Sequence, residues 1–376
     1  MSCGTSMASG GEAELDSKAS PRRGPRPFTE RRINSLRTRR RRQHWPADKP
    51  FKILSLDGGG IRGIYATALL KQIAAEITGG THIAEYFDMI AGTSTGGVIA
   101  LGLGLNKTAA DIHALYAEHG RRVFPQFWSR HPTLKFVRQF FRALHDHRVL
   151  EELLYDTFRD ATLGQSSVRL ILPAFLGPKT QIAVLKTDHH EDFRNDYRMA
   201  AWEAARATSA APAFFSGHGG ADYVFLDGGV WANNPIMAAV VDALSAYDVT
   251  RDQIQIFSLG TGNAPYEISK FAVRGGFFQW KELIKGAMFL TTDNAQAQAT
   301  LLLGPENILR LEPSGAAAEI DLDDWAAAAS QLVPLAVADF EQNRAAIEIF
   351  FQDKVAPRER HYTIAGEKRP LADQGG

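Results

Sequence analysis

Two short apolar runs near the start of the folded region each end in a glycine-rich turn and are followed by a helical stretch. Residues 51–56 precede Asp57 and three glycines, and residues 86–91 precede a second turn at Gly92. Between them, residues 64–77 carry apolar side chains at helical spacing. A strand, a turn and a helix in repeated order are typical of parallel β-α-β units. The chain is therefore expected to be an α/β protein with a mostly parallel central sheet.

Later segments continue this pattern. Apolar runs predict strands at 168–175, 181–185, 223–226 and 254–259, and helical spacing predicts helices at 197–208, 236–245 and 323–351. The last helix contains Pro334, where a break is expected because proline lacks the amide hydrogen that a helix interior needs. Two aromatic segments, 106–150 and 266–305, fit the alternation poorly and are expected to be helical insertions beside the sheet.

The chain is expected to comprise a leader, a catalytic domain and a C-terminal cap. Residues 21–49 contain ten Arg and one Lys against two acids, and residues 1–49 have little apolar periodicity. Such a composition is typical of disorder. The favoured interpretation is a solvated basic leader, with a tether to anionic lipid as the alternative. The catalytic domain is expected at 50–312, and a helical cap and tail at 313–376.

Composition argues against several classes of protein. Lys and Arg together equal Asp and Glu, 42 against 42, so no overall field draws the chain to nucleic acid. The single cysteine, Cys3, allows neither an intramolecular disulfide nor a cysteine-based metal site. His189 and His190 lack partner ligands at metal-binding spacing and are expected in a surface loop, so neither a metal nor a cofactor is predicted. With no apolar signal peptide and no run near the roughly 20 residues that span a bilayer, the expected location is cytoplasmic.

The sequence G-x-S-x-G at residues 92–96 carries the clearest chemistry. A serine hydroxyl is a weak nucleophile unless it is exposed, oriented and deprotonated by a neighbour. A sharp turn between a strand and a helix presents the serine in this way, and small residues on both sides permit the turn. The predicted strand before Gly92 and the helix after Gly96 supply that context. Ser94 is therefore the candidate nucleophile.

A second glycine-rich element occupies residues 57–63, with the sequence DGGGIRG. Consecutive glycines allow backbone amides to converge on the negative oxygen that develops during acyl transfer. Gly58, Gly59 and Gly60 are the candidate donors, and Arg62 adds positive charge nearby. The same stretch also matches the dinucleotide fingerprint G-x-G-x-x-G. A nucleotide-binding regulatory module is therefore an alternative.

The third element is Asp227, which is followed by two glycines and ends the predicted strand at 223–226. Functional groups of α/β sheets gather where strands end. A Ser-His-Asp hydrolase needs a histidine after the aspartate in chain order, and His361 is the only histidine there. The residues alone leave two bases open, Asp227 by itself or His361 assisted by an acid.

Taken in order, the motifs at 57–63, 92–96 and 227–229 resemble those of the patatin-like phospholipase family, which has an oxyanion loop D-G-G-G-x-R/K-G, an elbow G-x-S-x-G and a motif D-G-G/A. Residues 207–212 also resemble the small-residue segment that precedes the family's aspartate. The resemblance covers about residues 51–262. It implies a three-layer α/β/α sandwich with helical insertions.

The resemblance also implies roles for individual residues. Ser94 would be the nucleophile and Asp227 its base, in a dyad without histidine. The three glycines at 58–60 would form the oxyanion hole, and Arg62 would support their loop. Members of the family cleave acyl esters of phospholipids, lysophospholipids or neutral lipids without needing calcium, so a phospholipid membrane surface is the implied substrate.

The chain further resembles the bacterial patatin-like effectors of anti-phage defence, because a catalytic core precedes a C-terminal helical cap in both. A cyclic nucleotide switches those effectors on, so the resemblance implies such an activator here. The oligomeric state is left open, with a homo-oligomer among the alternatives. The aromatic and basic residues within 124–142, and those around Phe277 and Phe278, are interpreted either as core or as a lid that contacts lipid.

Overall fold

An eight-stranded sheet forms the centre of the computed structural model, which describes residues 40–125, 147–177, 181–210, 217–220, 223–262, 280–363 and 365–369. The strands are β1 (Phe51–Leu56), β2 (Met89–Gly92), β3 (Arg169–Leu176), β4 (Gln181–Lys186), β5 (His218–Gly220), β6 (Tyr223–Asp227), β7 (Ile254–Leu259) and β8 (Ile308–Leu311). The helices are α2 (Ile64–Glu76), α3 (Thr95–Gly104), α4 (Ala109–Val123), α7 (His147–Phe158), α8 (Ala201–Thr208), α9 (Gly229–Ala232), α10 (Ile236–Ala246), α12 (Trp280–Leu303), α13 (Trp325–Ala327) and α14 (Val333–Glu348).

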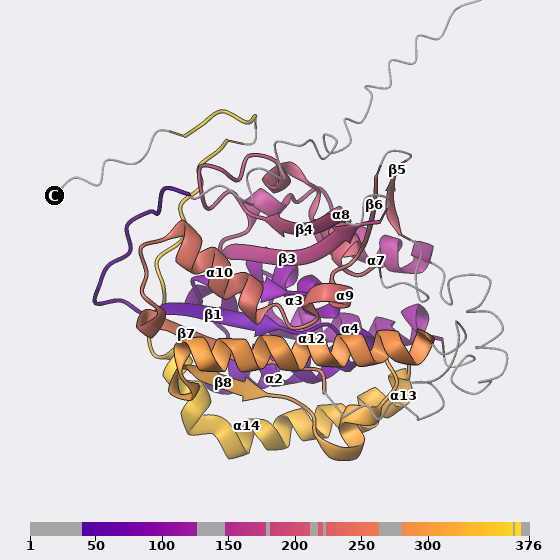
Figure 1. The fold of residues 1–376 in the computed structure, drawn as a ribbon. Coiled ribbons are helices and arrows are strands. Elements are labelled where there is room, and N and C mark those ends of the chain that lie inside the picture. The colour runs from indigo at the N-terminus through magenta and orange to yellow at the C-terminus, as the bar shows by residue number, and fades with distance from the viewer. Residues whose placement is uncertain are drawn as a thin grey trace, which may run out of the picture.

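Helices cover both faces of the sheet, because successive side chains of a strand point to opposite faces. In β1, Leu54 and Leu56 belong to one hydrophobic core, which also contains residues of α2, α3, α4, α8 and α14. Phe51 and Ile53 belong to a second core with α10 and the end of α12. Figure 1 shows α10 and α12 on the near face of the sheet and α2 and α3 behind it. The predicted three-layer α/β/α sandwich is confirmed.

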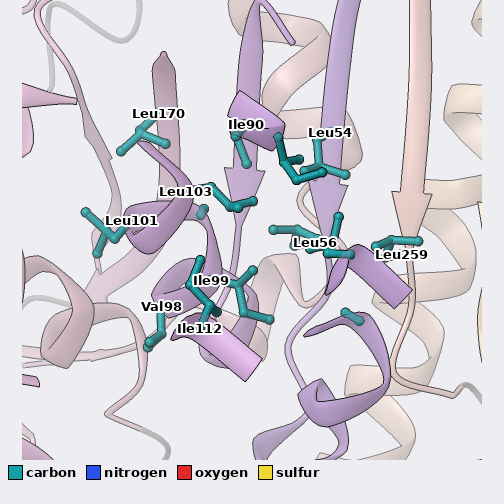
Figure 2. Packing of buried hydrophobic residues seen from close by; sticks show 14 of the residues in the cluster. Leu54, Leu56, Ile90, Val98, Ile99, Leu101, Leu103, Ile112, Leu170 and Leu259 are labelled. Atoms are coloured by element: carbon teal, nitrogen blue, oxygen red, sulfur yellow. The ribbon is translucent and has the colours of Figure 1, made fainter. Parts of the chain in front are cut away.

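Helix α3 packs at the centre of the first core. Figure 2 shows Ile99 and Leu103 of α3 on the side of the sheet where Leu56 and Ile90 project from β1 and β2. Every residue of α3 is buried. Burying one Ile or Leu side chain contributes about 1.5–3 kcal/mol to stability, so the helix that follows Ser94 is held firmly against the sheet.

Five strands of the sheet are joined by parallel pairing, and the other three pair only antiparallel. The order is β5-β6-β3-β2-β1-β7-β8, and β4 pairs with β3 outside this path. Strands β3, β2, β1, β7 and β8 are parallel to their neighbours in this group. Strands β4, β5 and β6 pair antiparallel. The mostly parallel sheet is therefore confirmed, with an antiparallel portion that the strand–helix alternation does not reveal.

Most predicted strands and helices agree with the structure to within one residue at each end, and the larger differences are at β2, α8 and Pro334. Strand β2 begins at Met89, and residues Ile83–Tyr86 form a 3-10 helix instead of the predicted start of the strand. The predicted helix at 197–208 begins only at Ala201, after a separate 3-10 turn. Near Pro334 the chain stays helical, and a π-helical turn at Ala328–Leu332 accommodates the missing amide hydrogen.

The C-terminal helices pack onto the sheet layers. Phe340 and Ile347 of α14, followed by Phe350 and Phe351, are part of the first core, together with residues of α2. Within the described ranges, no helix combines the length and apolar character that crossing a bilayer requires.

The last residues of the expected leader are folded. Gln43 donates its amide hydrogen to the Ala246 carbonyl at 2.8 Å. The ring of Trp45 lies 4.7 Å from that of Phe51 and 5.7 Å from that of Tyr247. The prediction that the disordered leader extends to residue 49 is therefore wrong for residues 40–49. Their contacts are with distant parts of the chain, and such contacts produce no periodic pattern in the sequence. The remainder, 1–39, lies outside the described residues.

A buried charged cluster surrounds Asp242 on α10. Lys186 forms an ion pair with this carboxylate, and His189 Nε2 lies 2.8 Å from its Oδ2 atom. Burial disfavours the charged carboxylate, yet Lys186 and His189 hold the pKa of Asp242 below its usual range. Burial also lowers the pKa of His189 to about 4. The prediction that His189 and His190 lie in a surface loop is wrong, because both are buried.

Replacing Asp242 by Asn should lower the free energy of unfolding by about 3–5 kcal/mol, because it leaves the buried Lys186 without its counter-charge. Urea unfolding at neutral pH measures this. The matched control is Asp252→Asn, whose partner Arg251 is exposed, and which should change stability by less than about 1 kcal/mol. Similar small effects of both substitutions would show that the cluster contributes little.

Candidate active site

Ser94 occupies a sharp turn between β2 and α3. Its backbone has φ 55° and ψ −122°, a positive-φ conformation that residues with a side chain rarely adopt. Such strain is typical of functional turns. The flanking glycines are required sterically, because a methyl group on Gly96 would lie 2.2 Å from the Leu56 carbonyl oxygen. The predicted elbow geometry is present.

Thr208, at the end of α8, secures this turn. Its hydroxyl donates to the Pro173 carbonyl at 2.6 Å and accepts the amide hydrogen of Ser94 at 3.1 Å. The sequence identified the small-residue segment that contains Thr208 but gave it no role. The contact depends on how α8 packs against β3, which no local pattern specifies.

The strand pairing brings Asp227 to the serine. Ile171 of β3 pairs with β2 on one edge and with β4 on the other, whereas Ala174 pairs with Asp227 of β6 and again with β4. Because a strand has only two edges, β2 and β6 lie end to end on the same edge of β3. Their carboxyl ends therefore meet, one leading into Ser94 and the other ending at Asp227.

The Asp227 carboxyl group is buried and hydrogen-bonded. Burial raises its pKa to about 6, against the opposing effects of the Ser94 side chain, the Gly229 amide and the charge of Arg206. The Gly229 amide donates to Oδ1 at 2.7 Å. A buried carboxyl group beside a serine side chain in one cavity has the placement expected of a base and its nucleophile.

Two glycines of the loop at 57–63 lie at the cavity that contains Ser94 and Asp227. Gly59 and Gly60 line a cavity together with Ser94 and Asp227. Within the described part of the chain their amide hydrogens meet no acceptor, whereas Gly58 donates its own to the Asn233 carbonyl at 2.9 Å. Of the three glycines expected to form the oxyanion hole, Gly58 therefore has its donor already engaged.

Arg62 lies behind the loop and does not line the cavity. One of its guanidinium nitrogens donates to the Ala318 carbonyl at 2.9 Å and to the Gly262 carbonyl at 3.3 Å. Burial lowers its pKa to about 10, so the group is still charged at neutral pH. This placement suits the expected supporting role, as opposed to direct contact with a substrate.

The cavity beside Ser94 is mainly apolar. Leu322, in a turn, lines one part of it. Most of the wall consists of residues in or next to α3, α4 and α7, namely Val98, Leu115, Tyr116, Val123, Phe124, Leu150, Leu153 and Leu154. The expected insertion at 106–150 thus supplies α4 and α7 to the wall of the cavity. Most of its aromatic segment, and the segment around Phe277 and Phe278, lie outside the described residues, so the choice between core and lid stays a prediction.

Several known phospholipases are similar to this chain in sequence. A family model of patatin-like phospholipases matches residues 54–240. The chain is 30% identical over 350 residues to the cGAMP-activated phospholipase of Escherichia coli strain TW11681, covering 83% of this chain and 96% of that protein. It is 31% identical over 258 residues to the protein of that name from Pseudomonas aeruginosa strain BWHPSA011 / Pa011, covering 66% of this chain and 75% of that protein. The chain belongs to the patatin-like phospholipase family.

Another relative carries a different activator in its name. The cUMP-AMP-activated phospholipase of Escherichia coli is 30% identical over 228 residues, covering 58% of this chain and 67% of that protein. Membership in the patatin-like phospholipase family assigns the chain to the hydrolases that act on lipid esters. It also favours a hydrolase over the nucleotide-binding regulatory module as the class of this protein.

The geometry of this patatin-like phospholipase disfavours a histidine base. The His361 amide donates to the Asp188 carbonyl at 3.1 Å, and its ring lies 3.3 Å from the Gln43 side chain. His361 does not line the cavity that contains Ser94. Among the residues that the structure describes, no group of His, Cys, Asp or Glu side chains is arranged to hold a metal ion.

One ion pair behind the glycine loop was missed by the sequence analysis. Arg310 on β8 lies 2.7 Å from Asp57, 2.8 Å from Glu312 and within hydrogen-bond distance of Ser258. Burial raises the pKa of Asp57 to about 6, and Arg310 opposes that shift. Asp57 therefore anchors the start of the patatin-like loop to the neighbouring strands, and more than 250 residues separate it from its partner.

Replacing Gly60 by Ala should reduce activity by about 100- to 1,000-fold, the cost of misplacing one oxyanion donor. Gly60 has φ 56°, and an added methyl group would lie 2.4 Å from the Leu322 carbonyl oxygen, so the loop must move. The control is Gly79→Ala, at φ 59° with open space around it. It carries the same backbone strain without the clash and should leave the specific activity within a few-fold of wild type. Equal activities of the two variants would contradict the assignment.

Proposed function

We propose that this protein hydrolyses fatty-acyl esters of membrane phospholipid through an acyl-enzyme, with Ser94 as nucleophile and Asp227 as its base. The observation that carries the proposal is that Ser94, on its strained turn, lines the same mainly apolar cavity as the buried Asp227 carboxyl group, whose pKa the Ser94 side chain lowers. An apolar cavity of this kind suits a fatty-acyl chain, and a dry site keeps the carboxylate basic.

The reaction would proceed in two halves. Ser94 attacks the acyl carbonyl carbon while Asp227 accepts the hydroxyl proton, and the negative oxygen is stabilised by the amides of Gly59 and Gly60. The ester bond then breaks, and Asp227 returns the proton to the leaving alcohol. Water next attacks the acyl-enzyme, giving its proton to Asp227, and the fatty acid leaves as Ser94 regains a proton.

The proposal extends to regulation. Two relatives similar over most of their length are named for activation by cGAMP, and a third for activation by cUMP-AMP. We therefore propose that a cyclic dinucleotide switches on this enzyme, that it acts at the cytoplasmic membrane surface, and that degradation of membrane phospholipid serves anti-phage defence.

Activity should fall about tenfold per pH unit below about pH 6, since a base must be deprotonated to act. The pKa of Asp227 is raised to about 6, so the acid limb of kcat/KM against pH should bend there. Asp57 has a pKa of about 6 as well, so the limb alone does not identify the group. Asp57→Asn should lower stability and keep the limb. Loss of the limb in that variant would contradict the assignment to Asp227.

A direct test uses vesicles of mixed phospholipids with EDTA present. Free fatty acid is measured with cGAMP, with cUMP-AMP and without nucleotide. In parallel, a fluorophosphonate is applied, which phosphonylates activated serines with loss of fluoride, and the labelled peptide is identified by mass spectrometry. Fatty-acid release together with label on Ser94 is the expected result. Label elsewhere, or no release by correctly folded protein in any arm, would refute the proposal.

A further inference from the structure

A second pocket lies apart from the catalytic cavity, beside the C-terminal segment. Arg198, Arg360 and Arg369 line it, together with the rings of Tyr197 and Tyr362. The two tyrosine rings stack, with their centroids 5.5 Å apart and their planes 16° from parallel. We call this the three-arginine pocket. No residue of the catalytic machinery belongs to its lining.

All of the charged residues that line the three-arginine pocket are basic. No Asp or Glu is among the residues that line it. In the described part of the chain, Arg198, Arg360 and Arg369 have no carboxylate within ion-pair distance, although ion pairs are found for Arg358 and Lys368 beside them. Three guanidinium groups gathered without counter-charges favour an anionic ligand.

The arginines also keep donors free for a ligand. Arg360 donates to the Gln165 carbonyl at 3.1 Å, and Arg369 Nε to the Tyr362 carbonyl at 3.2 Å. Arg198 Nε donates to the Tyr197 hydroxyl at 2.9 Å. A guanidinium carries five N–H donors in a planar fork that matches phosphate oxygens. Since these bonds use one donor each, several donors of each group are left for a phosphodiester.

The turn at Gly366 fixes this arrangement. Its φ of 92° is one that glycine adopts readily. A methyl group at that position would lie 1.6 Å from a terminal nitrogen of Arg198. The C-terminal segment therefore lies directly against the guanidinium, so a ligand held by all three arginines would tie this segment to the 3-10 turn at Asp196–Arg198.

Two helices connect the three-arginine pocket to the catalytic cavity. Helix α7 contributes Leu150 and Leu154 to the wall of that cavity and leads into the turn at 162–165, which lines the second pocket. Helix α8 follows Arg198 and ends at Thr208, whose hydroxyl holds the Ser94 amide.

The turn that follows α7 and the segment that precedes α8 are hydrogen-bonded to each other. The Leu163 amide donates to the Met199 carbonyl at 2.9 Å, and the Ala201 amide donates to the Ala161 carbonyl at 2.8 Å. A ligand that moves one turn therefore moves the other, and each turn leads through one helix to the catalytic cavity.

We propose that the three-arginine pocket is the regulatory site, and that it binds the phosphodiester groups of a cyclic dinucleotide. The inference rests on the proposed activation and adds to it a binding site and a route of coupling. Binding draws the C-terminal segment and the two turns together, and the shift reaches Ser94 through α7 and α8. A phospholipid headgroup carries the same phosphodiester chemistry, so the test separates the two sources.

Binding is measured by calorimetry on the Ser94→Ala protein, which cannot turn over lipid. The ligands are cGAMP, cUMP-AMP, inorganic phosphate and vesicles containing phosphatidylglycerol. At least one dinucleotide should bind, and the double variant Arg360→Ala, Arg369→Ala should weaken its binding by about 100-fold or more, because each charged hydrogen bond contributes about tenfold or more. The control is Arg251→Ala, an exposed arginine elsewhere on the surface, which should bind as the parent does.

Several results would overturn the inference. These are failure of the parent protein to bind either dinucleotide, unchanged binding in the double variant, or binding that depends on the arginines but occurs only with the vesicles. Circular dichroism of the double variant checks that its fold is intact, and Arg360→Lys, Arg369→Lys should recover part of the affinity. Because the measurement does not use the catalytic serine, its outcome is independent of whether the proposed hydrolysis by Ser94 holds.

Discussion

Replacing Ser94 by Ala should reduce fatty-acid release from phospholipid vesicles to background, a loss of about a millionfold in kcat. Within the described part of the chain, Ser94 is the hydroxyl residue whose side chain acts on the pKa of the Asp227 carboxyl group. Without a nucleophile at the strained turn, no acyl-enzyme forms. The glycine amides and Asp227 can then assist only the direct attack of water on the ester, without the covalent intermediate that divides the reaction into two easier steps.

The measurement compares initial rates of the variant and the wild type at saturating lipid, with and without nucleotide. Ser209→Ala is the matched control, because Ser209 lines the same cavity but donates its hydroxyl hydrogen to the Ala205 carbonyl at 2.7 Å. It should retain activity within a few-fold of wild type. Substantial release by the Ser94 variant, in protein free of contaminating lipase, would mean that a different nucleophile is used.

Motifs whose geometry is local in the chain were predictable. The elbow at 92–96 and the loop at 57–63 each need only a strand, glycines and a following helix, all of which can be read from adjacent residues. The same holds for the layered fold, since alternating apolar runs and helical spacing predict two faces that must both be covered.

Contacts between distant segments were not predictable. Asp227 was selected because it ends a strand, on the assumption of a parallel sheet, but β6 is antiparallel to β3 and reaches Ser94 from the opposite direction. The bond from the Gly58 amide to Asn233 and the ion pair between Arg310 and Asp57 likewise depend on tertiary packing.

Buried charge is the other feature that a sequence conceals. The residues next to His189 in the sequence are typical of a loop, yet the His189 side chain is buried against Asp242. Polar residues are normally exposed, and the exceptions are paired. Here the partners are contributed by β4, α10 and the segment at residue 40, so the pairing exists only once the sheet is assembled.

Replacing Asp227 by Asn should reduce kcat by about 10,000-fold or more, because the amide has the shape of the carboxyl group but cannot accept the Ser94 proton. Reaction with a fluorophosphonate should slow in parallel, since that reagent also requires an activated serine. Fatty-acid release and labelling are measured on the same preparation. A variant that keeps more than about a hundredth of the wild-type rate would point to another base.

The same substitution should make the protein more stable at pH 8. The folded pKa of Asp227 is raised from 3.8 to about 6, so the native state binds this proton more tightly than the unfolded chain does. Stability of the wild type therefore falls as the pH rises from about 4 to 6, by about 3 kcal/mol in total. The Asn variant does not ionise and avoids this cost, so its advantage should be largest above pH 6 and vanish near pH 4. Urea unfolding at both pH values measures the difference, and a variant less stable than wild type at pH 8 would show that the carboxylate is held for structure, not for proton transfer.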